Sequence, residues 1–191
     1  RAGHSVTVFE RDNRIGGLLR YGIPDFKLEK NIIDRRINIL IEEGIDFKCN
    51  INVGKDIGIQ ELKSNYDAVL VCTGSTEKRS LDIPGHELFG IEQSMDFLTH
   101  NNKFVDNQIK AHLDRYNAKD KNIIVIGGGD TGSDCIGTSN RHGAKSVVNF
   151  ELSSKPGKTR SLSNPWPYWP FTLKTTSSHQ EGVSREWSIL T

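Results

Sequence analysis

Residues 122–152 read NIIVIGGGDTGSDCIGTSNRHGAKSVVNFEL and predict one βαβ unit. The β-branched run Ile123–Ile126 predicts a strand, and this strand stops at three consecutive glycines. About ten helix-compatible residues follow, and a second apolar run ends in Phe150 and Glu151. The stretch therefore predicts two parallel strands joined by a helix, which is the repeating unit of an α/β protein.

The glycines of this stretch match the pattern G-x-G-x-x-G at Gly127, Gly129 and Gly132. In dinucleotide-binding proteins the first glycine allows a tight turn, the second lets a pyrophosphate approach the backbone, and the third lets the helix pack against the strand. The helix that follows offers free N–H groups and the positive end of its dipole to phosphates. The pattern thus predicts a dinucleotide site, and the alternative is a glycine-rich turn that binds nothing.

Glu151 lies 19 residues after Gly132, where a carboxylate is expected to accept hydrogen bonds from an adenosine ribose. A carboxylate there binds a free 2′-hydroxyl and repels a 2′-phosphate, which favours NADH over NADPH. Four nearby cations could bind that phosphate instead: Arg141, Lys145, Lys155 and Lys158. The nucleotide is therefore predicted to be NADH or NADPH, with NADH preferred.

Asp130 places a carboxylate inside the predicted phosphate-binding loop, next to Thr131. Asp is a favoured residue at helix N-caps, where its side chain accepts backbone N–H groups. We therefore expect Asp130 to turn away from the phosphates and to cap the helix over residues 131–133.

The beginning of the chain repeats the end of this unit. Residues 1–10 read RAGHSVTVFE and residues 141–151 read RHGAKSVVNFE, so one inserted residue separates two versions of the same passage. Glu10 thereby becomes the candidate ribose carboxylate of a second nucleotide site, and the alternative is a surface charge at a strand end. By the spacing of the complete copy, about 20 residues of strand, glycine loop and helix are expected before Arg1 in a longer parent protein.

Composition narrows the classes of partner. The formal net charge is +1, which gives no reason to expect nucleic acid or an anionic membrane as a partner. No apolar run is long enough for a membrane span, and the first residues have no signal-peptide pattern. Cys49, Cys72 and Cys135 form no C-x-x-C pair, which predicts buried, reduced thiols in a cytoplasmic protein. No constellation of catalytic or metal-binding side chains is recognised, so neither class of residue is predicted.

The remaining segments predict an organisation in two parts. Residues 11–30 carry several glycines and one proline, which predicts a long loop beside the first strand. A helix is predicted over residues 28–43, with Ile33, Ile37, Leu40 and Ile41 on its apolar face. The run Tyr66–Cys72 predicts a buried parallel strand. Shorter elements are predicted at residues 45–49, 51–53, 59–62 and 90–101, with a polar connector over 102–121 and a domain boundary at residues 83–85.

Two passages carry a family resemblance: ERDNRIGGLLRYGIPDFKL at residues 10–28 and PWPYWP at residues 165–170. They resemble the glutamate synthase small subunit, or the equivalent C-terminal domain of a fused glutamate synthase, and the resemblance covers almost the whole chain. It implies an α/β fold of the two-dinucleotide-binding flavoprotein type, with two Rossmann-like domains that are both incomplete here. Residues 1–85 would be part of an FAD-binding domain and residues 86–191 an NAD(P)-binding domain.

The resemblance also implies which residues approach FAD. Arg14, Ile15, Gly16, Gly17 and Leu18 would lie along its phosphates and ring. Thr73 and Gly74, after Cys72, are similar to the turn that closes such FAD domains. The competing interpretation is ordinary packing for the apolar loop residues and solvated charges for Arg20 and Lys27.

The implied activity is hydride transfer from NAD(P)H to FAD. The reduced flavin would pass electrons to iron–sulfur clusters of the parent protein, which this chain does not bind. A large subunit, or the preceding domain of a fused chain, would then make glutamate from glutamine and 2-oxoglutarate. Two alternatives remain: a docking module whose nucleotide is structural, and an input domain of another oxidoreductase, such as a dihydropyrimidine dehydrogenase-like enzyme. The aromatic segment at residues 165–170 is expected to pack locally, and the alternative is that it stacks on a nicotinamide or on a partner's surface. His179 is expected to be structural, and the alternative is a catalytic role.

Overall fold

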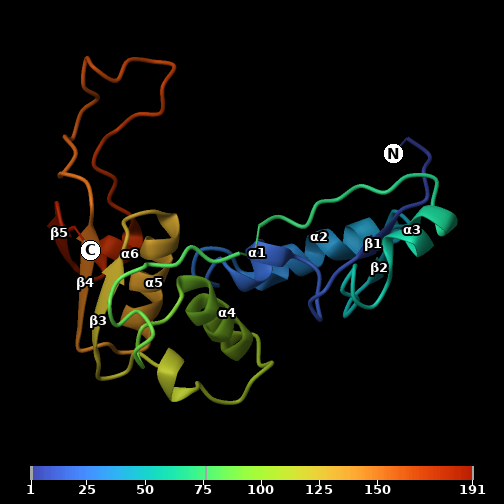
Figure 1. Cartoon of the computed structure of the whole chain (residues 1–191), viewed down its shortest axis with the longest axis horizontal. Coiled ribbons are helices and arrows are strands. Elements are labelled where there is room, and N and C mark those ends of the chain that lie inside the picture. Colours follow the sequence, from blue (N-terminus) through green and yellow to red (C-terminus); the bar gives the residue numbers. More distant parts are fainter. Residues whose placement is uncertain (1, 76, 191) are drawn as a thin grey trace. The chain divides into compact units, whose positions relative to one another are not determined.

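A computed structural model describes residues 2–75 and 77–190 of the chain (Figure 1). The chain divides into two compact units, Arg1–Ser80 and Leu81–Thr191, and each is described by itself. Among the described residues, no helix combines the length and apolar character that a membrane crossing requires.

The first unit contains two parallel strands, β1 (Thr7–Phe9) and β2 (Asp46–Lys48). Two helices connect them, α1 (Gly17–Tyr21) and α2 (Lys30–Glu42), and α3 (Ile59–Asn65) follows β2. The predicted strand at residues 45–49 is confirmed in β2, whereas the one at 51–53 is reduced to a single bridge at Val53. The long loop predicted over residues 11–30 is not continuous, because α1 forms within it.

Helix α2 confirms the helix predicted over residues 28–43. Gly44 follows it with φ of 91°, a left-handed conformation that ends a helix readily when the residue is glycine. Ile33 is buried and Ile37 and Leu40 are half-buried, whereas Ile41 is exposed. The apolar stripe of this helix is thus narrower than the sequence pattern predicted.

The buried strand predicted at Tyr66–Cys72 is wrong. Within the described residues this segment joins no strand ladder, and the side chain of Leu70 is 87% exposed. A parallel strand is buried only when neighbouring strands and covering helices are supplied on both sides. The described sheet of this unit has two strands, β1 and β2, and neither pairs with the segment. Cys72 is consequently exposed, against the prediction of three buried thiols.

The second unit contains a parallel sheet in the order β3-β4-β5, formed by β3 (Asn122–Ile126), β4 (Ser146–Glu151) and β5 (Ser184–Trp187). Helix α5 (Asp130–Arg141) connects β3 to β4 and packs against both, which confirms the predicted βαβ unit. Helices α4 (Ser94–Val105) and α6 (Ser177–Gln180) pack against α5 (Figure 1). The core of this unit consists of Leu98, Val125, Cys135, Ile136 and Val147.

Three features of this unit differ from the sequence expectations. The predicted helix at residues 90–101 begins and ends later, as α4, and the short helix η1 (Asp114–Tyr116) interrupts the connector. The connector is not simply surface, since Asn102 and Ala118 are buried. Strand β5 was not predicted, because its residues alternate between exposed and half-buried and carry two charges.

A half-buried histidine, His142, links α5 to α4 and to the connector. The Nδ1 atom of His142 accepts the backbone N–H of Ala118 at 3.2 Å, and its Nε2 lies 2.9 Å from Asn101 Oδ1. The His112 ring centroid lies 4.4 Å from that of His142. Burial, together with the charges of His112 and His100, lowers the pKa of His142 to about 4. The neutral ring is therefore part of the packing.

Candidate dinucleotide-binding site

The glycine loop lies at the carboxyl ends of β3 and β4. Gly127 follows β3 with φ of 102°, and its N–H donates to Phe150 O at 2.9 Å. This left-handed conformation requires glycine at the turn. The carboxyl edge of a parallel sheet is where α/β proteins bind ligands, so the loop occupies the place that a nucleotide site requires.

Gly129 and Gly132 differ in their surroundings as the pattern predicts. A Cβ atom on Gly132 would lie 2.2 Å from Gly127 O, because the helix passes directly against the loop backbone. A Cβ atom on Gly129, the N-cap of α5, would have nothing within 4 Å. Gly132 is therefore required for packing, whereas Gly129 leaves open space at the start of the helix.

Gly128, between Gly127 and Gly129, lies next to the end of the Glu151 side chain. A Cβ atom there would lie 2.0 Å from the carboxylate of Glu151. The strand-end carboxylate thus lies directly against the glycine loop. The three consecutive glycines were a signal for this contact, although the G-x-G-x-x-G pattern leaves the position between its first two glycines unspecified.

Asn149 braces the loop from the central strand. Its side chain is fully buried, and Nδ2 donates to Val125 O and to Gly127 O, both at 3.0 Å. It therefore satisfies two carbonyls at the point where β3 becomes the loop. Sequence reasoning missed this residue, and the signal available was a single amide within an otherwise apolar strand.

Glu151 forms an ion pair with Arg185 of β5. Arg185 Nη2 donates to Glu151 Oε1 at 2.6 Å, and each side chain is 15% exposed. Arg185 Nη1 also donates to Lys174 O at 2.9 Å, and its guanidinium lies 4.5 Å from the ring centre of Trp187. Arg185 was missed because it lies 34 residues beyond Glu151 in a segment that was not predicted to be a strand.

Asp130 does not have the predicted capping role. Gly129 is the N-cap of α5 and no side chain caps that end, while Asp130 and Thr131 are exposed residues of the first turn. Asp130 has helical backbone geometry, which directs its side chain away from the N–H groups that an N-cap side chain reaches. Its charge instead interacts favourably with the N-terminal end of the helix dipole.

The structure does not bring Arg141 to the glycine loop. Arg141 ends α5, about 16 Å along the helix axis from Asp130 at a rise of about 1.5 Å per residue. Both of its terminal nitrogens bind the Glu181 carboxylate. The assignment of Arg141 to the nucleotide is thus corrected. This residue links the C-terminal end of α5 to Glu181.

His179 is structural, as predicted. Its Nδ1 accepts the N–H of Thr176 at 3.0 Å, and the two residues form a capping box at the start of α6. Thr176 Oγ1 also lies 2.6 Å from Ser133 Oγ on α5. This contact fixes α6 beside the first turns of α5.

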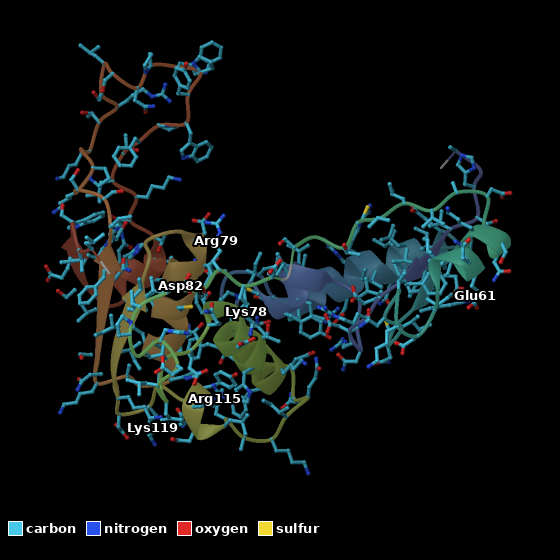
Figure 2. The ribbon with its side chains drawn as sticks, viewed as in Figure 1. Glu61, Lys78, Arg79, Asp82, Arg115 and Lys119 are labelled. Atoms are coloured by element: carbon cyan, nitrogen blue, oxygen red, sulfur yellow. The ribbon has the colours of Figure 1, made fainter. Side chains whose placement is uncertain are left out.

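The aromatic segment PWPYWP, residues 165–170, lies on a long loop between β4 and α6 (Figure 1). Trp166 is 83% exposed, and Tyr168 and Trp169 are also exposed. Figure 2 shows ring side chains of this loop pointing outward. The prediction of local packing is therefore wrong for these rings, and Lys174 Nζ lies 4.5 Å from the ring centre of Trp169.

The first unit carries the candidate FAD residues. The Glu10 carboxylate accepts a hydrogen bond from the backbone N–H of Asp12 at 2.9 Å, which stabilises the turn that follows β1. Arg14 pairs with Asp34 at 3.1 Å, and Arg20 donates to the same carboxylate. Arg20 is only 3% exposed, which excludes the solvated alternative for this residue.

The glycines of that loop adopt backbone conformations suited to glycine. Gly16 has φ of 134° and Gly17 has φ of 47°, and Leu18, which follows, is exposed. Thr73 and Gly74 are exposed and lie outside the strand ladder among the described residues. The structure thus gathers Arg14 and Gly16 around Arg20 and Asp34, whereas it pairs neither Thr73 nor Gly74 with β1.

Comparisons with known proteins agree with this architecture. The chain is 46% identical, over all of its length and 40% of the relative's, to the glutamate synthase [NADPH] small chain of Mycobacterium tuberculosis. It is 50% identical, over 95% of its length and 8% of the relative's, to the glutamate synthase [NADH] of Saccharomyces cerevisiae. The chain therefore spans less than half of these relatives.

The fold is shared with a solved structure. FprA of Mycobacterium tuberculosis, in complex with NADPH, superposes with a TM-score of 0.64 over 78% of this chain and 37% of that one, at 23% identity. The predicted dinucleotide-binding α/β fold is thereby confirmed. Residues 1–164 match the family described as pyridine nucleotide-disulphide oxidoreductase, and the chain belongs to that family.

Proposed function

We propose that the chain is the electron-input part of a glutamate synthase, with FAD at the first unit and NAD(P)H at the second. The observation that carries this proposal is the glycine loop, which leaves open space at Gly129 on the carboxyl edge of the sheet. The identity with glutamate synthases supports the reaction class. The division after Ser80 supports two domains, close to the boundary expected at residues 83–85.

The residues of the second unit fit a dinucleotide. The free N–H groups at the start of α5 and the space at Gly129 would hold the pyrophosphate. Asn149 fixes the loop that presents these groups, and Glu151 would bind the adenosine ribose. Asp130 and Thr131 border the same helix end. These groups bind and orient, which suits a reaction that depends on positioning rather than on an acid or a base.

The first unit would contribute one side of the FAD site. Arg14, Gly16, Gly17 and Leu18 would follow the cofactor, and Glu10 would meet its ribose once released from the Asp12 amide. Thr73 and Gly74 would lie along the same cofactor. When both cofactors are bound, they supply hydride transfer from the nicotinamide to the flavin.

We further propose that electrons leave the flavin for iron–sulfur clusters held by other parts of the parent protein. A large subunit or a preceding domain would use them to form glutamate from glutamine and 2-oxoglutarate. The relatives include both a small chain and a far longer protein, which supports either arrangement. A cytoplasmic location fits the three cysteines, which are all unpaired.

The test uses the intact parent protein and the flavin absorbance under anaerobic conditions. Addition of NADH or NADPH is expected to bleach the flavin band, and Gly129→Ala is expected to slow this bleaching strongly because the methyl group takes the phosphate's space. Gly58→Ala is the matched control, since Gly58 also has negative φ and open surroundings but lies in the first unit. A flavin that stays oxidised in the unmodified protein would overturn the proposal.

A further inference from the structure

The ion pair beside the glycine loop bears on which nucleotide is accepted. Strands β4 and β5 pair Asn149 with Arg185 and Glu151 with Trp187. Residues two apart on a strand share a face. Asn149, Glu151, Arg185 and Trp187 therefore lie on one face of the sheet, at the edge where the loop lies.

Arg185 is held in place independently of Glu151. Its Nη1 donates to Lys174 O and its guanidinium stacks on Trp187. Its Nε is buried and has no hydrogen-bond partner among the described residues. A guanidinium fixed by other contacts is preorganised, so it stays in position if the carboxylate moves away.

The ion pair changes which nucleotide a carboxylate at this strand end is expected to favour. A lone Glu would accept hydrogen bonds from a 2′-hydroxyl and repel a 2′-phosphate. Here Arg185 Nη2 lies 2.6 Å from Glu151 Oε1, so the pair has no net charge. The planar fork of an arginine also matches the geometry of a phosphate. The expected discrimination against a 2′-phosphate is thereby removed.

We propose that Arg185 is a specificity-determining residue, which neutralises Glu151 and binds the 2′-phosphate of NADPH. This inference rests on the proposed function of the second unit. The site then accepts both nucleotides. Glu151 accepts a hydrogen bond from the 2′-hydroxyl of NADH, and Arg185 binds the 2′-phosphate of NADPH.

The test is calorimetric titration of the intact parent protein with 2′,5′-ADP and with 5′-AMP, which probe the adenosine half of each nucleotide. Arg185→Gln is expected to weaken 2′,5′-ADP binding by about tenfold or more and to change 5′-AMP binding by less than about twofold, because a charged hydrogen bond is lost and Glu151 is uncovered. Glu151→Gln is expected to strengthen 2′,5′-ADP binding. Arg185→Lys, which keeps the charge but not the fork, should fall between the unmodified protein and Arg185→Gln.

Arg115→Gln provides the matched control, because Arg115 also pairs with a glutamate, Glu92, but lies on η1 (Figure 2). It should leave both affinities unchanged. Equal losses for the two ligands in Arg185→Gln, or unmodified protein that binds 5′-AMP but not 2′,5′-ADP, would overturn the inference. Flavin that neither NADH nor NADPH reduces would instead overturn the proposed function, and this second measurement separates the two failures.

Discussion

Two strand-end carboxylates, Glu10 and Glu151, close two versions of the same passage but have different surroundings. Glu10 binds the amide of its own loop, two residues away. Glu151 lies against a glycine loop and is held by an arginine from a third strand. The repeated sequence thus specifies a strand that ends in a carboxylate, whereas the elements packed around that strand decide what the carboxylate can do.

The strands themselves differ at one informative position. Asn149 precedes Phe150-Glu151 in the second copy, and Val8 precedes Phe9-Glu10 in the first. Asn149 binds two carbonyls at the glycine loop, whereas Val8 has no polar side-chain atom with which to do so. The brace is therefore a feature of the second copy alone.

The largest expected effect comes from Gly132→Ala, which would force a methyl group against Gly127 O. We expect unfolding free energy to fall by about 3 kcal/mol, because backbone rather than a flexible side chain opposes the new atom. Urea denaturation followed by circular dichroism measures this loss. Gly129→Ala is the control, and a similar destabilisation there would contradict the different roles assigned to the two glycines.

Asn149→Val replaces the asparagine that supports the glycine loop with the residue found at the equivalent position of the first copy, Val8. We expect a loss of about 2 kcal/mol, because Val125 O and Gly127 O each lose a buried donor. Denaturation measures stability, and 5′-AMP titration should show weaker binding as the loop loosens. Unchanged stability and affinity would show that the brace is unimportant.

Acid should weaken the second unit more than the first, because the half-buried His142 belongs to the second unit. Its folded pKa of about 4 lies below the value of about 6.5 for an exposed histidine, so the unfolded chain takes up a proton first. Stability is then lost as the pH falls from about 6.5 to about 4, by about 1–2 kcal/mol for this half-buried ring. Hydrogen exchange of α5 amides at a series of pH values measures it. His142→Gln should flatten the profile, and an unchanged profile would contradict the assignment.

The smallest effect is expected from Glu10→Gln, which weakens one charge-assisted bond to the loop. We expect a cost below about 1 kcal/mol, visible as severalfold faster hydrogen exchange at the Asp12 amide. The same substitution at Glu151 should leave that amide unaffected. Protection of Asp12 that does not change would show that the Glu10 charge is not needed for this local closure.

The parts of the fold that could be predicted are those specified by neighbours in sequence. The strand, glycine loop and helix from Ile123 to Arg141 depend on local turn chemistry and apolar spacing, and the structure contains them. Helix α2 was predicted for the same reason. The βαβ unit therefore required no knowledge of the rest of the chain.

The parts that could not be predicted depend on distant partners. The Glu151–Arg185 pair joins residues 34 apart, and β5 has no apolar alternation strong enough to identify it. The Tyr66–Cys72 run has the composition of a buried strand, but burial is a property of the neighbours that a strand acquires. Asn149 could have been noticed, yet its two acceptors become evident only when the strands are paired.

The exposed tryptophans on the loop between β4 and α6 give the protein an intrinsic optical reporter. Trp166 and Trp169 are open to solvent, whereas the third tryptophan, Trp187, is half-buried beneath Arg185. Collisional quenchers such as acrylamide should therefore extinguish most of the emission from the first two while sparing the third. A partner that binds over this loop would shift the tryptophan emission to the blue and shield it from the quencher. Binding of that partner could therefore be followed without attaching a dye.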